Sequence, residues 1–446
     1  MKIRHKGESG GEGGGGEGFA RILANTGWLL GGKGVGAVLS LAYLAIVTRT
    51  LGVADFGRFA LVLSAAQAIK TLTTFDSWQV IIRFGQAHLA EGRLDRLNRL
   101  LRFCIFIDLA SALVGSLLAA AAVFAFGPMM GLSREMGTQA VLFCMVMLLT
   151  IRSAPTGVLR LFDRFDAGAV AETMIPIGRM IAAVLALFLM PTISGFLLGW
   201  AAAELLCALS YWGLALREAR GRIGGWRAGR AMDARRENPG IIAFLTSTNL
   251  QTTMASMGQQ VTVLIIGAFV GPVGAGLYRF ANQLSNSLAK ISSLLSRSIF
   301  VELSRTHATQ GMAQLRALFR RTNRLSLIAG AIIIALTALL GRPLLGLIAG
   351  PDFLPAYPLL LLLGIAASID LIGVSYRPLL MATDGAGLSL RITALATALL
   401  VVLLAVLLPL YGTIGAAVAN IAAASVAFVL MRVATRRALT PARGQD

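Results

Sequence analysis

Long apolar runs, separated by short connections rich in arginine, follow one another along almost the whole of this chain. A stretch of about 18 or more apolar residues is long enough to cross a bilayer as a helix. Hydrophobic residues make up 56% of the chain and charged residues only 14%, with a mean hydropathy of +0.75, and these proportions exclude a soluble multidomain protein. The pattern predicts an all-α polytopic membrane protein.

The apolar runs form two groups of six, on either side of a hydrophilic stretch near the middle of the chain. The first six expected spans fall at about residues 22–48, 56–82, 100–126, 138–158, 168–190 and 193–215. The second six fall at about residues 241–270, 277–300, 323–349, 356–380, 388–408 and 411–431. We therefore expect a disordered Gly-rich tail (1–20), an N-terminal six-helix bundle (21–216), a basic linker (217–240), a C-terminal six-helix bundle (241–432) and a second tail (433–446).

A short polar break between two spans recurs in the second half of the chain. The stretch 49–59 recurs as residues 269–278, and a constant offset of 219 residues places Gly52 on Gly271 and Gly57 on Gly276. We interpret these four glycines as hinges, because glycine adopts positive φ without the penalty that other residues incur. The repeat indicates a head-to-tail duplication of six helices.

The distribution of basic residues predicts the orientation in the membrane. Alternate connections, including both tails and the linker, carry 29 lysines and arginines, whereas the other connections carry four. The positive-inside rule then places both termini and the linker in the cytoplasm. The same rule explains the net charge of +19 and the pI of about 11.2 without a nucleic-acid partner.

Neither a metal centre, a cofactor nor a catalytic site is expected. Cys104, Cys144 and Cys207 lie inside apolar runs at unrelated spacings, which is typical of packing residues. The glycines before Lys33 resemble a phosphate-binding P-loop, but glycine stands where the motif needs Ser or Thr, and helix packing explains them better.

Seven basic residues lie inside the expected spans, where each charge costs about 2.5–3.5 kcal/mol at a helix centre. We expect Lys33, Lys70 and Lys290 to line a wet cavity, since no acid lies one helical turn away on the same span. Arg179 and Arg377 are further candidates, although Arg179 could instead pair with Glu172, two turns away on the same helix face. Arg152 and Arg279 are expected to extend to the membrane interface.

Uncharged polar residues on the same spans are expected to line the cavity as well: Asn25, Gln67, Asn249, Gln259, Gln260, Asn282, Gln283 and Asn286. Basic groups neutralise phosphate and amides bond sugar hydroxyls, so this composition favours an anionic, polyhydroxylated substrate. Asp76 and Asp370 are candidates for ion coupling.

Four motifs in the connections resemble those of the Wzx-like oligosaccharide flippases, a branch of the multidrug/oligosaccharidyl-lipid/polysaccharide (MOP) exporter superfamily. They are Thr48-Arg-Thr-Leu-Gly-Val-Ala-Asp-Phe-Gly57, Leu159-Arg-Leu-Phe-Asp-Arg-Phe-Asp166, Gly267-Ala-Phe-Val-Gly-Pro-Val-Gly-Ala-Gly-Leu-Tyr278 and Leu410-Tyr-Gly-Thr-Ile-Gly-Ala-Ala417. The resemblance covers about residues 20–435. It implies two six-helix bundles around a central cavity, and translocation of an undecaprenyl-diphosphate-linked oligosaccharide across the bacterial inner membrane by alternating access.

The resemblance also implies partners: the lipid-linked oligosaccharide, membrane lipids, and polysaccharide polymerase and chain-length assembly proteins. Where the family often has an acid in the seventh span, this chain has Gln259 and Gln260, which weakens any inference of cation coupling there. A cation-coupled small-molecule exporter of the same architecture is the alternative. A membrane-embedded enzyme is the third reading, disfavoured because the longest loop is arginine-rich and has no histidine.

The orientation can be tested by thiol labelling of whole cells. Single cysteines introduced on the side predicted to be periplasmic should react with an impermeant reagent, namely at Arg134, Pro191, Val273, Pro351 and Tyr411. Cysteines at Gly92, Gly224 and Gly311 should react only after the cells are opened. Labelling at Gly224 from outside would contradict the arrangement of two bundles joined by a cytoplasmic linker.

Overall fold

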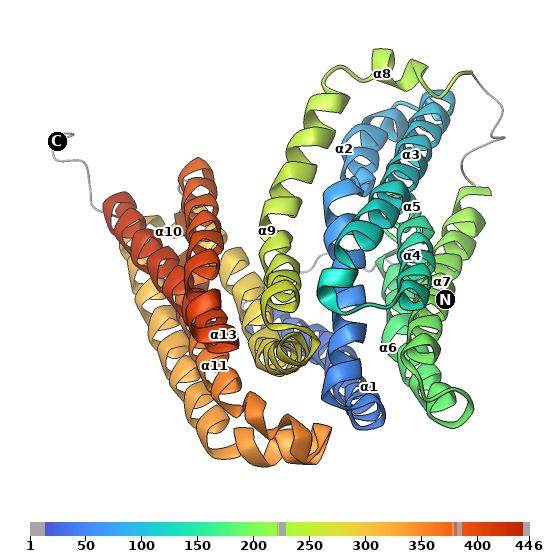
Figure 1. Cartoon of the computed structure of the whole chain (residues 1–446). Coiled ribbons are helices and arrows are strands. Elements are labelled where there is room, and N and C mark those ends of the chain that lie inside the picture. Colours follow the sequence, from blue (N-terminus) through green and yellow to red (C-terminus); the bar gives the residue numbers. More distant parts are fainter. Residues whose placement is uncertain (1–13, 221, 223–228, 377–378, 381–385, 440–446) are drawn as a thin grey trace.

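The computed structural model folds the chain into long helices that run roughly side by side, with no strand in the part of the chain that it describes (Figure 1). It describes residues 14–220, 222, 229–376, 379–380 and 386–439, and over residues 14–35, 288–318 and some shorter stretches it describes the backbone alone.

The N-terminal bundle contains seven helices, because two of the expected spans are broken and two are merged. They are α1 (Gly14–Thr73), α2 (Ser77–Ala90), α3 (Leu94–Phe126), α4 (Arg134–Leu149), α5 (Ser153–Leu161), α6 (Phe165–Leu189) and α7 (Ile193–Arg220), with the 3-10 turn η1 (Pro128–Met130) between α3 and α4. The short helix α8 (Asp233–Glu237) lies in the linker.

The C-terminal bundle follows the linker and is built in the same manner. Its elements are α9 (Ile241–Val270), α10 (Pro272–Ala349), η2 (Pro351–Ala356), α11 (Tyr357–Ile372), η3 (Gly373–Ser375) and α13 (Ala386–Leu439).

Eight stretches of the described residues are long and apolar enough to cross a membrane. Two of them, Val38–Ala90 and Gly387–Arg436, contain a non-helical glycine, Gly52 and Gly412 respectively, and each therefore corresponds to two expected spans. Helix α9 and the first part of α10 occupy the positions of two further spans. The fold class of an all-α polytopic membrane protein is confirmed.

The two aligned connections share one backbone conformation. Gly52 has φ 70° and ψ 179°, and Gly271 has φ 87° and ψ −179°. A residue with a side chain is strained at such φ values, so glycine is required at both positions. This matching pair of positive-φ glycines is what a duplication predicts, and their action as hinges stays a prediction.

Gly57 and Gly276 play a different part from the one expected, because neither has a positive φ. They lie within helices, at the point where α1 and α10 cross. A Cβ atom on Gly57 would lie 1.8 Å from the carbonyl oxygen of Pro272, and one on Gly276 would lie 2.7 Å from that of Val53. These two glycines are therefore required by the close approach of two backbones.

The crossing belongs to a hydrophobic core shared by both bundles at the end of the molecule that carries the glycine hinges, here termed the hinge end. Phe56 of α1 packs edge to face on Phe280 of α10 and Phe353 of η2, with ring centroids 6.3 and 5.7 Å away. Arg49 of α1 donates hydrogen bonds to two carbonyls at the end of α10, those of Leu347 (2.5 Å) and Ile348 (3.1 Å).

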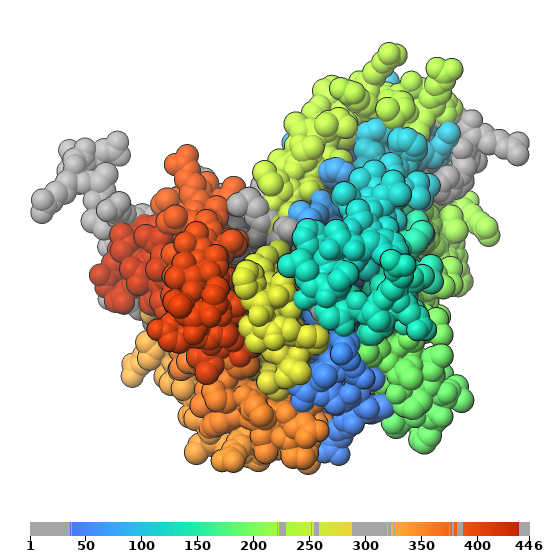
Figure 2. Space-filling model, in the orientation of Figure 1, coloured from blue at the N-terminus to red at the C-terminus, as the bar shows by residue number. Residues whose placement is uncertain are grey.

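The opposite end is termed the linker end because α8 lies there, and it has two separate cores. One belongs to the N-terminal bundle and also buries Ile241 and Leu245 of α9, and the other belongs to the C-terminal bundle. Towards this end α9 stays beside the N-terminal bundle while α13 leans away from it in Figure 1, and the space-filling surface is hollowed between α13 and α9 in Figure 2. The structure is therefore closed at the hinge end and open at the linker end.

Two membrane-spanning segments of the N-terminal bundle are broken near their middle, between α1 and α2 and between α4 and α5. Such breaks free backbone carbonyls that must be satisfied inside the protein. Lys70 Nζ donates to the carbonyl of Met147 (2.8 Å), Asn249 Nδ2 to that of Thr74 (2.7 Å) and Trp212 Nε1 to that of Ile151 (2.9 Å). Side chains from three different helices thus stabilise the breaks.

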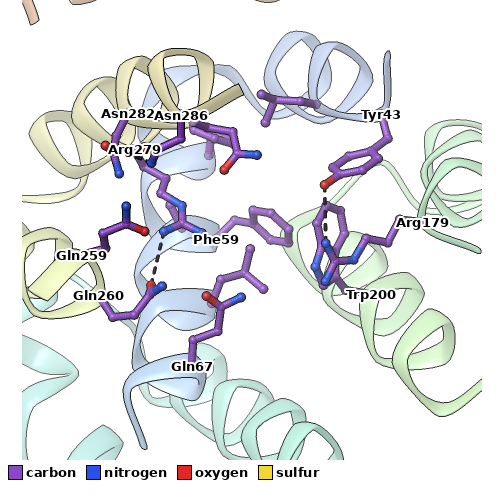
Figure 3. A pocket seen from close by; sticks show the side chains of 15 residues that line it. Tyr43, Phe59, Gln67, Arg179, Trp200, Gln259, Gln260, Arg279, Asn282 and Asn286 are labelled. Carbon is purple, nitrogen blue, oxygen red and sulfur yellow. Dashed lines mark hydrogen bonds between the residues drawn. The ribbon is translucent and has the colours of Figure 1, made fainter. Parts of the chain in front are cut away.

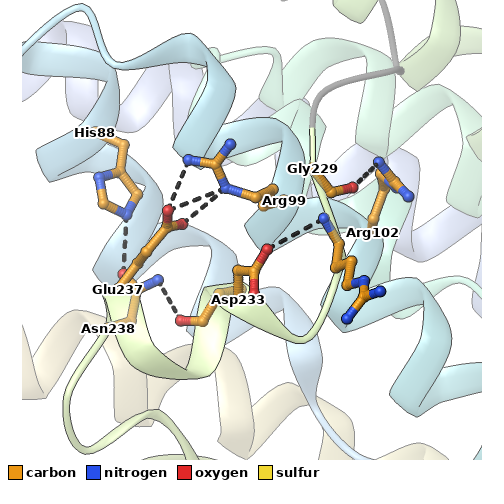
Figure 4. A network of polar contacts seen from close by, with 9 residues as sticks. His88, Arg99, Arg102, Gly229, Asp233, Glu237 and Asn238 are labelled. Atoms are coloured by element: carbon orange, nitrogen blue, oxygen red, sulfur yellow. Dashed lines mark hydrogen bonds and ion pairs between the residues drawn. The ribbon is translucent and has the colours of Figure 1, made fainter.

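The linker is anchored to the N-terminal bundle by a polar network (Figure 4). Arg99 of α3 forms a bidentate ion pair with Glu237 of α8, at 2.6 Å for the shortest N–O distance. The His88 ring lies 2.9 Å from Asn238 Oδ1, and Arg102 donates to the carbonyl of Gly229 (2.9 Å). The end of the linker therefore belongs structurally to the N-terminal bundle.

The crossing of α1 and α10 can be tested with the smallest possible side chain. Gly57→Ala should destabilise the protein by about 1–3 kcal/mol, because the added methyl group overlaps the carbonyl of Pro272. Gly213→Ala is the control, since a Cβ atom there meets nothing within 4 Å. Thermal unfolding of the purified proteins in detergent measures both, and equal melting temperatures would contradict the close crossing.

Candidate functional site

A cavity of about 240 Å³ lies between the two bundles, beside the shared core (Figure 3). Helices α1, α6 and α7 contribute to it from the N-terminal bundle, and α9 and α10 from the C-terminal bundle. Its lining residues are Tyr43, Leu44, Phe56, Phe59, Ala60, Leu63, Gln67, Arg179, Trp200, Gln259, Gln260, Arg279, Asn282, Gln283 and Asn286.

The two sides of the cavity differ in chemistry. The C-terminal bundle presents amides, from Gln259 and Gln260 of α9 and from three residues of α10. The N-terminal bundle presents aromatic rings: Trp200 packs edge to face on Tyr43 and on Phe59, with centroids 4.9 and 5.3 Å away. Amides bond hydroxyl and phosphate oxygens, whereas aromatic faces bury apolar surface and attract positively polarised C–H groups.

Arg279 provides a positive charge on the amide side. Its guanidinium donates to Gln260 Oε1 (3.3 Å), and among the described residues it forms no ion pair with a carboxylate. This position corrects the expectation that Arg279 extends to the membrane interface. A buried cation that lacks a carboxylate partner is costly, and an anionic ligand would relieve that cost.

Arg179, on the aromatic side, is neutralised by an acid. Its Nη2 lies 2.8 Å from Glu204 Oε1 of α7, its Nη1 lies 3.4 Å from the Tyr43 hydroxyl, and its Cζ lies 4.6 Å from the Trp200 ring centroid. The suggested partner Glu172 is instead exposed.

Glu204 also binds Arg152, whose Nη2 lies 3.0 Å from its other carboxylate oxygen. The side chains of Glu204, Arg179 and Arg152 are 3%, 18% and 26% exposed, so the cluster is largely withdrawn from solvent. The expectation that Arg152 extends to an interface is therefore wrong. Glu204 of α7 therefore binds both Arg179 of α6 and Arg152, the residue before α5.

The predicted site residues fall into several groups. Gln67, Gln259, Gln260, Asn282, Gln283, Asn286 and Arg179 come together around the cavity. Lys70 and Asn249 do not line it and cap the broken helices instead. Asp76 precedes α2 and Asp370 lies on an exposed position of α11, so these two acids are not brought together at the cavity.

Four predicted residues are not tested by the structure. Lys33 and Asn25 lie in α1 and Lys290 lies in α10, at positions where the backbone alone is described, and Arg377 lies outside the described residues. Their place in the cavity stays a prediction.

Residues 22–307 match the family described as polysaccharide biosynthesis protein, and the chain belongs to this family. It is 28% identical over 346 residues to the inner membrane protein YghQ of Escherichia coli (strain K12), which covers 77% of this chain and 96% of that protein.

Solved structures with the same fold are transporters. The fold matches a structure of the lipid II flippase MurJ in an inward closed conformation, with a TM-score of 0.74, 12% identity and coverage of 91% of this chain and 86% of that one. It also matches an inward-facing multidrug resistance MATE family transporter of the MOP superfamily, with a TM-score of 0.71, 12% identity and coverage of 90% and 95%. The chain has the fold of the MOP transporters and flippases.

The acid at the centre of the cluster can be tested by neutralisation. Glu204→Gln should destabilise the protein by about 3–5 kcal/mol, because it leaves two buried arginines without their carboxylate. Glu172→Gln should have little effect, since Glu172 is exposed. Thermal unfolding in detergent and the yield of inserted protein measure the difference, and equal stability of the two variants would contradict the assigned pairing.

Proposed function

We propose that this protein is a flippase that moves a lipid-linked oligosaccharide, carried on a diphosphate, across the bacterial inner membrane for the assembly of a surface polysaccharide. The observation that carries the proposal is the cavity, where Arg279 stands among amides on one side and aromatic rings line the other. A diphosphate needs a cation and hydrogen-bond donors, and a sugar needs amides and a flat apolar surface.

The orientation of the molecule agrees with entry of cargo from the cytoplasm. Under the positive-inside rule the linker is cytoplasmic, so the open linker end would face the side on which the lipid-linked precursor is made. The family to which the chain belongs and the name of its relative YghQ support an inner-membrane location. Lys33, Lys290 and Arg377 are proposed to add to the positive charge along the route of the cargo.

A cation-coupled exporter of small cationic molecules is less well supported. A cationic substrate would require an uncompensated acid in the cavity, and the described lining contains none, since Glu204 lies behind Arg179. Polysaccharide polymerase and chain-length assembly proteins are proposed as functional partners, because the exported units must be joined on the far side of the membrane.

The proposal is tested in a deletion strain complemented with variants of the gene. Deletion should cause the lipid-linked intermediate to accumulate in the cytoplasmic leaflet, and the wild-type gene should restore export. Arg279→Gln should weaken cargo binding about 10- to 100-fold, because a hydrogen bond to a charged group contributes about 1.5–3 kcal/mol. Arg279→Lys should retain part of the export, since it keeps the charge but loses the planar head group.

Arg342→Gln is the matched control, because Arg342 is an exposed residue of α10, the helix that also carries Arg279. Extraction of lipid-linked glycans and analysis of surface polysaccharide measure the outcome. Export at the wild-type rate by Arg279→Gln, at equal abundance, would contradict the proposed site.

A further inference from the structure

The N-terminal bundle contains a second polar site, apart from the cavity and from the Glu204 cluster. Asp108 of α3 is 0% exposed and lies where both broken segments of the bundle resume, at the first residues of α2 and α5. Neither the proposed cargo nor the shared core uses this carboxyl group.

A chain of hydrogen bonds ends on Asp108. The backbone N–H of Trp78 donates to Ser153 Oγ (3.0 Å), which lies 2.9 Å from Ser77 Oγ, and Ser77 Oγ lies 2.7 Å from Asp108 Oδ2. Because Ser77 has a single hydroxyl hydrogen, which it gives to the carboxylate, Ser153 must donate to Ser77.

No cation compensates this acid among the residues that the structure describes. Arg152, at the break beside it, is turned towards Glu204. The carboxyl of Asp76 would repel a second negative charge at Asp108. Cys104, one turn earlier on α3, is buried and is a neutral thiol neighbour rather than a counter-charge. Asp108 Oδ1 has no hydrogen-bond partner.

Both protonation states of this carboxyl group are accessible on physical grounds. Removal from water disfavours the ionised form strongly, because an isolated buried carboxylate loses its hydration. The N-termini of α2 and α5, together with the Ser77 hydroxyl, favour the ionised form through charge–dipole attraction and hydrogen bonding. A bound metal ion is a poorer explanation, since such ions take several oxygen ligands and both serine hydroxyls are already engaged.

We propose that Asp108 is a proton-binding site of the protein. The carboxylate takes up one proton from water to become a neutral carboxyl group and returns it in the reverse step, so no further reactant is involved. Protonation neutralises Asp108 and weakens its attraction to the first residues of α2 and α5, because a neutral carboxyl group is a poorer hydrogen-bond acceptor and lacks the charge that the helix dipoles favour. It therefore loosens the linker-end half of the bundle at the two breaks. In the proposed flippase, the protonation state of Asp108 would thereby bias the angle between the two halves of the bundle.

Infrared difference spectroscopy of the purified full-length protein in lipid nanodiscs, without cargo, tests the site directly. Acidification should produce a carboxylic C=O band in the wild type, and Asp108→Asn should abolish that band. Asp76→Asn is the matched control, because it removes the neighbouring carboxyl group and should leave the band in place. A band that is unchanged by Asp108→Asn, or lost only in Asp76→Asn, would overturn the proposal.

Ser77→Ala provides a second reading that keeps the carboxyl group in place. It removes the hydrogen bond to the ionised form, so the band should persist to higher pH than in the wild type. If Asp108→Asn does not fold, the shift of the carboxylic band to higher pH in Ser77→Ala tests the proposal instead. A band that titrates at the same pH in Ser77→Ala and in the wild type overturns it. Sodium added at constant pH should leave the band unchanged, and its loss on sodium addition would indicate a cation site instead. The assay uses no cargo, so an incorrect cargo assignment would leave its result intact.

Discussion

The close crossing of α1 and α10 is the contact on which the rest of the structure depends. Gly57 and Gly276 allow two backbones to meet without a side chain between them, and this approach brings Phe56 against Phe280 and Phe353. This core lies at the hinge end, whereas at the linker end the start of α9 packs in the core of the N-terminal bundle and α13 diverges from it. The cavity lies beside the core, and Phe56 and Phe59 belong to both. One packing contact thus sets the position and the closed end of the site.

Compensation of charge explains the chemistry of the cavity. Three basic side chains lie in or near it, but Arg179 and Arg152 are held by Glu204, whereas Arg279 is bonded to a neutral amide. The number of basic residues in the membrane is therefore a poor measure of the charge that a cargo would meet. The carboxylate partners decide which of these residues remain available to an anion.

The sequence was sufficient for the features that depend on local pattern. Apolar runs located the helices, and the aligned glycines located two connections that share one backbone conformation, at Gly52 and Gly271. The amides of the cavity were also found, because they stand out within apolar spans. The pairing of charges was not predictable, since Glu204 lies 25 positions from Arg179 and 52 from Arg152 along the chain. The packing of α6 on α7 brings Arg179 to Glu204, and the packing of α5 on α7 brings Arg152 to it.

The role of Lys70 was missed for a related reason. A lysine in a span suggests a wet cavity when only neighbouring spans are considered, but a broken helix also leaves carbonyls that need a donor. Pro155, in the first turn of α5, is the sequence signal of the break between α4 and α5, but it does not show which side chain caps the break. Asn249 was misplaced in the same way. Arg279 was missed because its position near a connection suggested an interface, whereas the crossing of the helices turns this end of α10 inward.

Helix α9 connects the linker-end core of the N-terminal bundle to the shared core at the hinge end. Ile241 and Leu245 at its start are buried in the linker-end core of the N-terminal bundle, whereas Val263 and Ile266 near its end are buried in the shared core. The boundary between the parts that could move relative to each other therefore falls within the continuous helix α9. The linker at the midpoint of the chain lies wholly on the N-terminal side of that boundary. A rotation of the bundles would have to bend α9 elastically between its two buried ends. The stiffness of its middle turns would then set how far and how fast the molecule opens.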